Sequence, residues 1–201
     1  MQKQHIAGRK RRRELLENIK NRINAIESRQ DIFNDLSTKY IEQDWLASFI
    51  ANVPNPEDIQ KMKKGSSFIF ITFCIYSAIH IISIFITMTP MIMSNKKLIF
   101  VLPMTFFWPA IAIWCALRIK AYHGASYRVA GWVAIVLSLN NLSGLFKMPA
   151  ADVLSWTISI IVISLLSVSS FLAFKIRKTY FPHLAFQGAR KENGRYLLSR
   201  S

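Results

Sequence analysis

The second part of the chain is dominated by long apolar runs separated by short polar stretches. A helix of roughly 20 apolar residues is needed to cross a bilayer core about 30 Å thick. Four runs meet this length, at about 67–88, 98–117, 129–146 and 153–174. The third run is the least apolar, because Asn140, Asn141 and Gly144 lie near its end. The pattern therefore predicts an all-α membrane protein with a four-transmembrane-helix bundle at 66–174.

Residues 1–65 show a different pattern, in which apolar residues recur at spacings of three and four. This spacing is typical of an amphipathic helix with a narrow apolar stripe. It predicts one long helix over 12–42 and a second helix over 42–53, followed by a break at Pro54 and Pro56. The stripe could serve as an association seam between copies or with a partner, or it could pack on the second helix. The seam consists of Leu16, Ile19, Ile23, Ile26 and Phe33.

Charge decides the orientation of these segments. Of the 201 residues, 18% are charged, with a formal net charge of +15, and Asp152 is the only acidic residue between Asp58 and Glu192. Lysine and arginine are concentrated in cytoplasmic loops of membrane proteins. They flank the spans at 61–64, 118–128 and 175–178, against only Lys96, Lys97 and Lys147 on the other side. We therefore expect a multi-pass protein of a bacterial inner membrane, with its N-terminal region and its basic tail at 175–201 both in the cytoplasm.

A basic run stands at the start of the chain. It comprises Arg9, Lys10, Arg11, Arg12 and Arg13. Such a run beside a membrane anchor favours anionic lipid headgroups. A protein partner is the next interpretation, and nucleic acid is the least favoured of the three.

Polar residues inside the predicted spans are costly and often functional. On the first span they repeat at helical spacing, and further polar groups lie on the third and fourth spans. They could bind helices together, or they could line a hydrated path within one bundle or between copies. The candidate residues are Thr72, Tyr76, His80, Ser83, Thr87, Asn140, Asn141, Thr157, Ser164 and Ser167.

The sequence contains no motif for catalysis. The four histidines and two cysteines do not occur at metal-ligand spacing, the spans contain no paired carboxylates, and no phosphate-binding loop is present. No metal, cofactor or enzyme activity is therefore predicted. Pro103 and Pro109 are expected to kink the second span, and Asp152 is expected to cap the fourth.

The function that fits these patterns is that of a non-enzymatic, homo-oligomeric pore-forming or membrane-perturbing component. We expect it to be triggered or docked by a cytoplasmic protein through the N-terminal region. By analogy, such a small protein suits a bacterial defence or toxin-type system. The alternative is a membrane anchor that recruits a soluble partner and conducts nothing. A membrane-embedded enzyme is the least favoured hypothesis.

Overall fold

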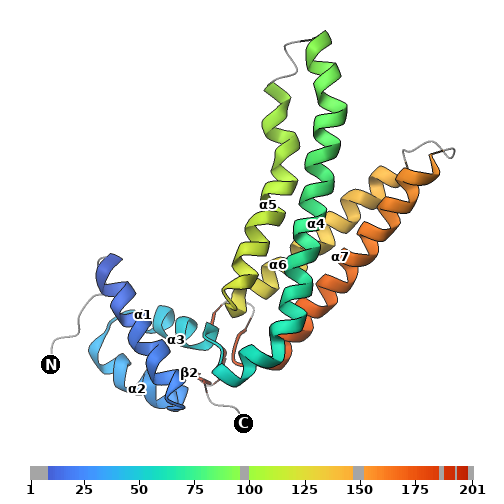
Figure 1. Cartoon of the computed structure of the whole chain (residues 1–201). Coiled ribbons are helices and arrows are strands. Elements are labelled where there is room, and N and C mark those ends of the chain that lie inside the picture. The colour runs from blue at the N-terminus through green and yellow to red at the C-terminus, as the bar shows by residue number, and fades with distance from the viewer. Residues whose placement is uncertain (1–8, 96–99, 147–151, 186–187, 193, 199–201) are drawn as a thin grey trace. The chain divides into compact units, whose positions relative to one another are not determined.

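The computed structural model describes residues 9–95, 100–146, 152–185, 188–192 and 194–198. Over these residues the chain is all-helical, with seven helices and one short antiparallel hairpin (Figure 1). The elements are α1 Arg9–Asn24, α2 Arg29–Lys39, α3 Gln43–Asn52, α4 Pro56–Ser94, α5 Leu102–Lys120, α6 Gly124–Leu145, α7 Val153–Tyr180, β1 Lys191–Glu192 and β2 Arg195–Tyr196.

The chain divides into two compact units. One, the head unit, combines three segments, 1–63, 122–125 and 176–201. The other, the bundle unit, consists of 64–121 and 126–175. The N-terminal region, the α5–α6 loop and the C-terminal tail therefore belong to one folded body, although they are far apart in sequence.

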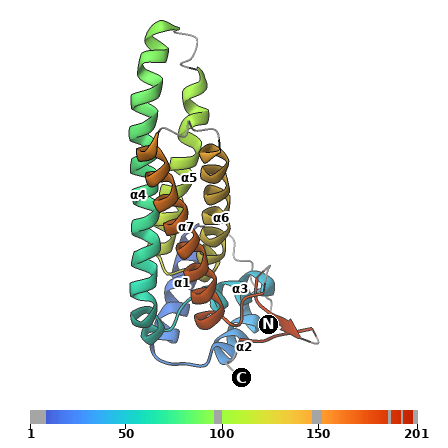
Figure 2. The same ribbon diagram turned by 90° about the vertical axis from the view of Figure 1, so that its right-hand side faces the viewer.

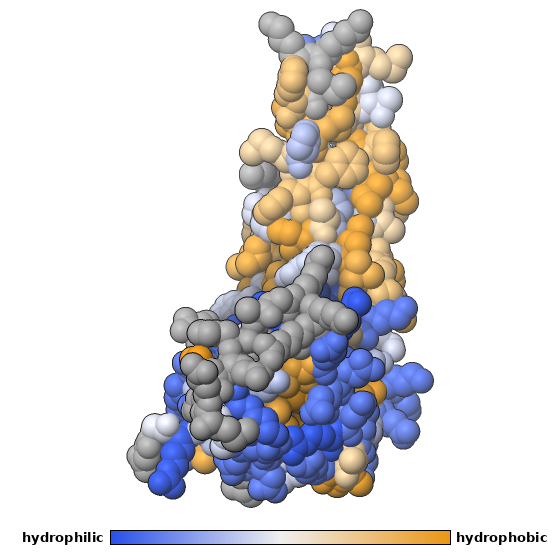
Figure 3. All heavy atoms as spheres, turned by 90° about the vertical axis from the view of Figure 1, so that its left-hand side faces the viewer, coloured by the Kyte–Doolittle hydropathy of each residue, from blue (hydrophilic) through white to orange (hydrophobic). Residues whose placement is uncertain are grey.

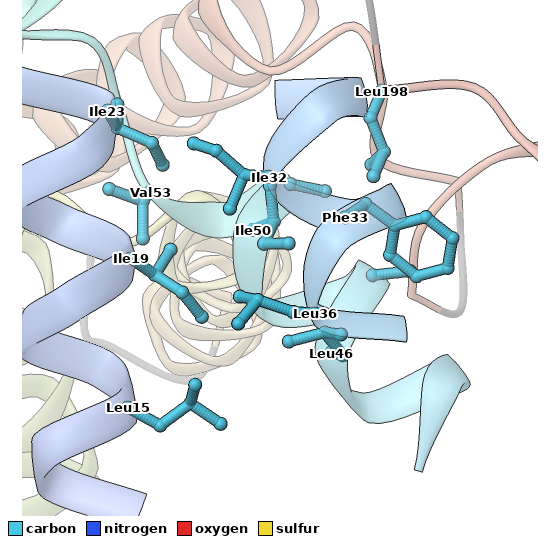
Figure 4. Close-up of a cluster of buried hydrophobic side chains, with 12 residues drawn as sticks. Leu15, Ile19, Ile23, Ile32, Phe33, Leu36, Leu46, Ile50, Val53 and Leu198 are labelled. Carbon is cyan, nitrogen blue, oxygen red and sulfur yellow. The ribbon is translucent and has the colours of Figure 1, made fainter. Parts of the chain in front are cut away.

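The core of the head unit forms where α1, α2 and α3 meet (Figure 4). Side chains from all three helices point into it, and Leu198 of the tail completes it. The members with no exposed surface are Ile19, Ile32, Leu46, Ala47, Ile50, Ala51 and Leu198. Burying one such isoleucine or leucine side chain contributes about 1.5–3 kcal/mol, so this cluster is the main source of stability in the head unit.

The single helix expected over 12–42 is in fact two helices, α1 and α2. The chain turns at Ile26, whose φ of 64° is rare for a β-branched residue and whose side chain is 86% exposed. Arg22 holds this turn by binding Glu27 and, at 2.7 Å, Asp35. Folding α2 back lets Phe33 join Ile19 in one core, which a straight helix could not do.

The predicted seam is therefore interrupted. Ile19, Ile23 and Phe33 are buried inside the head unit, whereas Ile26 is exposed. Near the start of α1, the predicted seam residue Leu16 is only partly buried, and its neighbour Leu15 is buried instead. The buried part of the seam therefore stabilises the head unit of this chain and is not exposed for contact with another chain.

The C-terminal tail packs on the same core. Tyr196 lies edge-on against Phe33, with ring centroids 4.9 Å apart. The guanidinium of Arg177, at the end of α7, donates a hydrogen bond to the carbonyl of Ala185 at 2.6 Å. The tail is thus an integral part of the head unit.

The α5–α6 loop is held in the head unit by a buried amide. The backbone N–H of Ala125 donates to Oδ1 of Asn52 at 2.7 Å, and Nδ2 of Asn52 donates to the carbonyl of Ser48 at 2.7 Å. Gly124 lies so close to Phe181 that a Cβ atom there would be 2.6 Å from its ring. Glycine is therefore required at the start of α6.

The bundle unit contains the helices suited to a membrane. Among the described residues, α4, α5 and α7 are long and apolar enough to cross one. The 22-residue α6 is not among these three helices. Large apolar side chains cover the outside of the bundle unit (Figure 3), with Phe85 61% and Phe171 66% exposed. Such a surface indicates a lipid environment.

Of the two prolines expected to kink the second span, only Pro109 lies inside the helix. Pro103 stands in the first turn of α5, where its missing N–H costs nothing, so it begins the helix rather than kinking it. Pro109 lies inside α5, and Pro90 lies inside α4, which runs beyond the predicted end at 88 to Ser94. Asp152 caps α7 as expected, because its carboxylate accepts the N–H of Ser155 at 3.1 Å.

Within the bundle unit, α4 pairs with α5 and α6 pairs with α7 (Figures 1 and 2). The two pairs approach each other at one end and diverge toward the other (Figure 1). We call the end where the two pairs approach each other the narrow end. It is formed by residues 64–66, 118–121, 126–128 and 173–175. At the other, the wide end, α4 and α6 end and α5 and α7 begin.

Candidate functional site

The polar stripe on α4 runs along the bundle from a buried to an exposed environment. Thr72 and Tyr76 are buried, His80 is partly buried, and Ser83 and Thr87 are exposed. The stripe therefore starts in the packed part of the bundle unit and emerges toward the wide end. Thr87 satisfies its own hydroxyl by donating to the carbonyl of Ser83 at 2.8 Å.

Tyr76, His80 and Asn141 form a polar cluster near the middle of α4. The rings of Tyr76 and His80 lie 4.2 Å apart, and the carboxamide of Asn141, from α6, lies beside both. Asn141 also donates through Nδ2 to the carbonyl of Leu137 at 2.8 Å. Within the described part of the chain, the buried Tyr76 hydroxyl finds no hydrogen bond of ordinary geometry. The Asn141 carboxamide is a polar neighbour of this hydroxyl, so the three side chains form a polar site inside the apolar bundle unit.

A cavity of about 500 Å³ adjoins the cluster, between α4, α6 and α7. Isoleucines of α4 and α7 form its apolar wall. Its polar lining consists of His80, Ser83, Asn141, Ser155 and Ser159. The cavity is large enough for water or small ions, and its five polar side chains offer them hydrogen bonds.

The bundle is closed between the cavity and the narrow end. Side chains there exclude solvent fully, among them Ile69 and Phe73 of α4 and Leu137 and Leu166 from the other pair. Nearer the narrow end, the hydroxyls of Ser66 and Tyr127 hydrogen-bond at 2.7 Å and join α4 to α6. A continuous path would therefore require the helix pairs to separate in this half.

The predicted polar residues of α7 lie on its outer face. Thr157, Ser164 and Ser167 are exposed, and each hydroxyl donates to the carbonyl four residues earlier at 2.8 Å. Of the predicted pair on α6, Asn141 lies beside the cavity and Asn140 is exposed. The structure thus brings His80, Ser83 and Asn141 together, whereas the α7 stripe of Thr157, Ser164 and Ser167 lies exposed on the outer face of the helix.

Other serines of α7, which are not among the candidate residues, face the inside. Ser159, Ser169 and Ser170 are buried on α7. Ser170 donates to the carbonyl of Gly131 at 3.1 Å and so joins α7 to α6. Small buried residues of this kind allow membrane helices to approach closely. The sequence does not identify them, because a serine can stand on either the buried or the exposed face of an apolar helix.

The basic run lies at the start of α1. The guanidinium of Arg12 stacks on Trp45 of α3, 5.7 Å from the ring centroid, and Arg13 is exposed. The side chains of Arg9, Lys10 and Arg11 lie outside the described residues. Arg12 is therefore partly used in packing the head unit, whereas Arg13 faces solvent.

The described residues contain no group of three or more histidine, cysteine, aspartate or glutamate side chains that could hold a metal ion. Cys74 is exposed and Cys115 is buried. Comparison of the chain with protein-family profiles, with curated proteins and with solved structures finds no match. The functional argument therefore depends on the geometry of the bundle and head units.

Proposed function

We propose that the chain is a non-enzymatic membrane protein with four spans, α4 to α7, and that both of its ends are cytoplasmic. The support comes from the composition of the head unit. Its segments 1–63, 122–125 and 176–201 pack into one body, and a folded body lies on one side of a bilayer. The chain must then cross the membrane an even number of times between each of these segments.

This parity argues that α6 is a span. Between 63 and 122 the even number is supplied by α4 and α5. Between 125 and 176 an even number of crossings requires both α6 and α7. A crossing by α7 alone would place the tail on the opposite side of the membrane. At a rise of 1.5 Å per residue, the 22 residues of α6 are long enough. The cations at the narrow end favour that end, and the head unit, on the cytoplasmic side of a bacterial inner membrane.

Cysteine accessibility tests this topology. In a background lacking Cys74 and Cys115, single cysteines at Asn95 and Val153 should react with an impermeant maleimide on intact cells. A cysteine at Arg190 should react only after permeabilisation. Labelling at Arg190 but not at Val153 on intact cells would show that α6 does not cross, and the four-span proposal would fail.

We further propose that copies of the chain assemble into a component that opens a polar path through the membrane. The observation that carries this proposal is the polar cavity beside Tyr76, His80 and Asn141. Intramembrane polar groups are expensive, and this cavity gathers five of them around a space that water can enter. The packed half toward the narrow end corresponds to a closed state.

The head unit is well placed to control such a path. Each membrane helix continues into it or is joined to it, since α4 begins there, α7 ends there, and the loop between α5 and α6 is bound there through Asn52. A cytoplasmic partner that rearranges the head unit would therefore act on both helix pairs. We propose a role as a defence or toxin-type effector by analogy alone.

Dye release from vesicles tests the path. Purified protein is reconstituted into vesicles with a small entrapped fluorescent dye, and His80→Leu and Asn141→Leu are compared with the unchanged protein. We expect both variants to slow release at least several-fold. Ser164→Leu and Ser167→Leu, on the outer face of α7, serve as the matched controls. They should leave release unchanged if the path runs through the cavity, and slow it if the path runs between copies. If all four variants release dye as the unchanged protein does, the conduit proposal is wrong.

A membrane anchor is the second candidate, and one observation favours it. The head unit has its own core and a separate groove of about 370 Å³ next to the exposed Ile26, which suits capture of a soluble partner. An anchor predicts that Ile26→Asp abolishes co-purification of that partner, and that His80→Leu leaves the protein's cellular function intact.

A further inference from the structure

The narrow end of the bundle unit carries a belt of positive side chains. Every helix of the bundle contributes to it. The belt consists of Lys64 of α4, Arg118 and Lys120 of α5, Arg128 of α6 and Lys175 of α7. All but Arg128, which is partly buried, are exposed.

Aromatic rings hold two of these cations in place. The guanidinium of Arg118 lies 5.4 Å from the ring centroid of Trp114, one turn earlier on α5. The ammonium of Lys120 lies 5.7 Å from the ring centroid of Phe70 on α4. A cation over an aromatic face is attracted electrostatically by the ring, so these contacts hold both charged groups at the narrow end.

No acidic residue offsets the belt within the bundle unit near this end. The only aspartate or glutamate in 64–121 and 126–175 is Asp152, which caps α7 at the wide end. The polar side chains between the two ends, among them His80 and Asn141, include no aspartate or glutamate. Apart from Asp152 at the wide end, the lysine, arginine, aspartate and glutamate side chains of the bundle unit are therefore all positive.

We infer that the path opened by this protein selects small inorganic anions over cations. This inference rests on the proposed function and specifies which ions pass through the proposed path. Because the belt draws on all four helices, the mouth of a path passes it whether the path runs inside one bundle or between copies. Rings of lysine and arginine produce anion selectivity in pores, and charges within a Debye length of about 8 Å act at physiological salt. Assembly of several copies multiplies the charge around the mouth.

The test is the reversal potential of the reconstituted protein in a planar bilayer. Zwitterionic phosphatidylcholine is used so that lipid charge does not contribute, and a tenfold gradient of potassium chloride is applied. Fixed fields of this kind change local ion concentrations by roughly 10-fold or more. We expect chloride to permeate at least about five times as well as potassium. The double variant Lys120→Gln, Arg128→Gln should bring this ratio at least twofold closer to one.

A charge-matched control separates the belt from overall charge. Arg13→Gln, Lys20→Gln removes the same two charges from exposed positions of α1 in the head unit and should leave the reversal potential unchanged. A reversal potential at zero or on the potassium side, with current present, overturns the inference and leaves the path standing. An absence of current in the unchanged protein overturns the proposed path and the inference together.

Discussion

Asn52 offers the sharpest test of how the head unit holds the membrane helices. The first N–H groups of a helix have no partner within it, and Ala125 is the second residue of α6. Asn52, 73 residues earlier in the chain, accepts that N–H at 2.7 Å. It therefore acts as a cap on α6 supplied from the head unit, and Asn52→Ala removes the cap without changing α6.

The size of the effect follows from burial. Asn52 is 5% exposed, whereas Ala125 is partly exposed, so water can replace the lost acceptor in part. The loss then falls near the net value of a hydrogen bond, about 0.5–1.5 kcal/mol, rather than the higher cost of an orphaned donor. At 25 °C this corresponds to about 2- to 13-fold faster hydrogen exchange at the start of α6.

Hydrogen–deuterium exchange of the protein in detergent measures this directly in peptides covering 121–130. Asn52→Asp keeps an acceptor at the N-terminus of α6, where a negative charge is favourable, so protection should survive in that variant. Asn34→Ala, in which an exposed asparagine of α2 is removed, is the matched control. Equal exchange in Asn52→Ala and Asn34→Ala would refute the view that Asn52 holds the α5–α6 loop.

Three further outcomes are expected. Leu46→Ala, at a fully buried position, should destabilise the protein by about 2–5 kcal/mol in thermal unfolding followed by circular dichroism. Ser66→Ala and Tyr127→Phe should show a coupling of about 0.6 kcal/mol in a double-mutant cycle of unfolding in detergent. A hydrogen bond from Lys191 lowers the pKa of Asp44 below 3.8, so the stability that this carboxylate contributes is fully present above pH 3.8 and is lost as pH falls through its lowered pKa. Asp44→Asn should accordingly make the melting temperature less sensitive to acid over that interval.

The membrane helices could be predicted from the sequence because an apolar run of sufficient length is a local property. Three of the four predicted runs correspond to helices that meet the length and hydropathy of a span. The ends were less accurate, since α4 starts at Pro56 and continues to Ser94. Pro90 removes one backbone hydrogen bond, yet α4 continues through it to Ser94, so the end of the apolar run did not mark the end of the helix.

The turn between α1 and α2 could not be predicted from periodicity. Residues spaced three and four apart fit a straight helix that meets a partner, and they fit equally well two helices that fold on each other. Only tertiary packing decides, because Ile32 and Phe33 gain a buried environment when α2 folds back. The local signals were Ser28, at the N-cap of α2, and the pairing of Arg22 with Glu27 across the turn.

The inside of the bundle was only partly predictable for a related reason. In lipid, both faces of a helix are apolar, so hydropathy does not distinguish a buried face from an exposed one. On α4 the bulky polar residues Tyr76 and His80 could be recognised, because their size requires a specific environment. On α7 eight serines and threonines lie on several faces, and the pattern selected Ser164 where the structure buries Ser169.

The composition of the head unit connects these observations. A body made from the N-terminal region, the α5–α6 loop and the tail constrains all four helices of the bundle unit at one end, through α4, Asn52 and α7. The opposite ends are joined only in pairs, and the polar cavity lies toward them. Movement of the helices relative to one another therefore requires less disruption at the wide end than at the narrow end, where Ser66 and Tyr127 and the packed side chains around them must separate. For the proposed path, the closed half, rather than the cavity, is therefore expected to set the energy of opening.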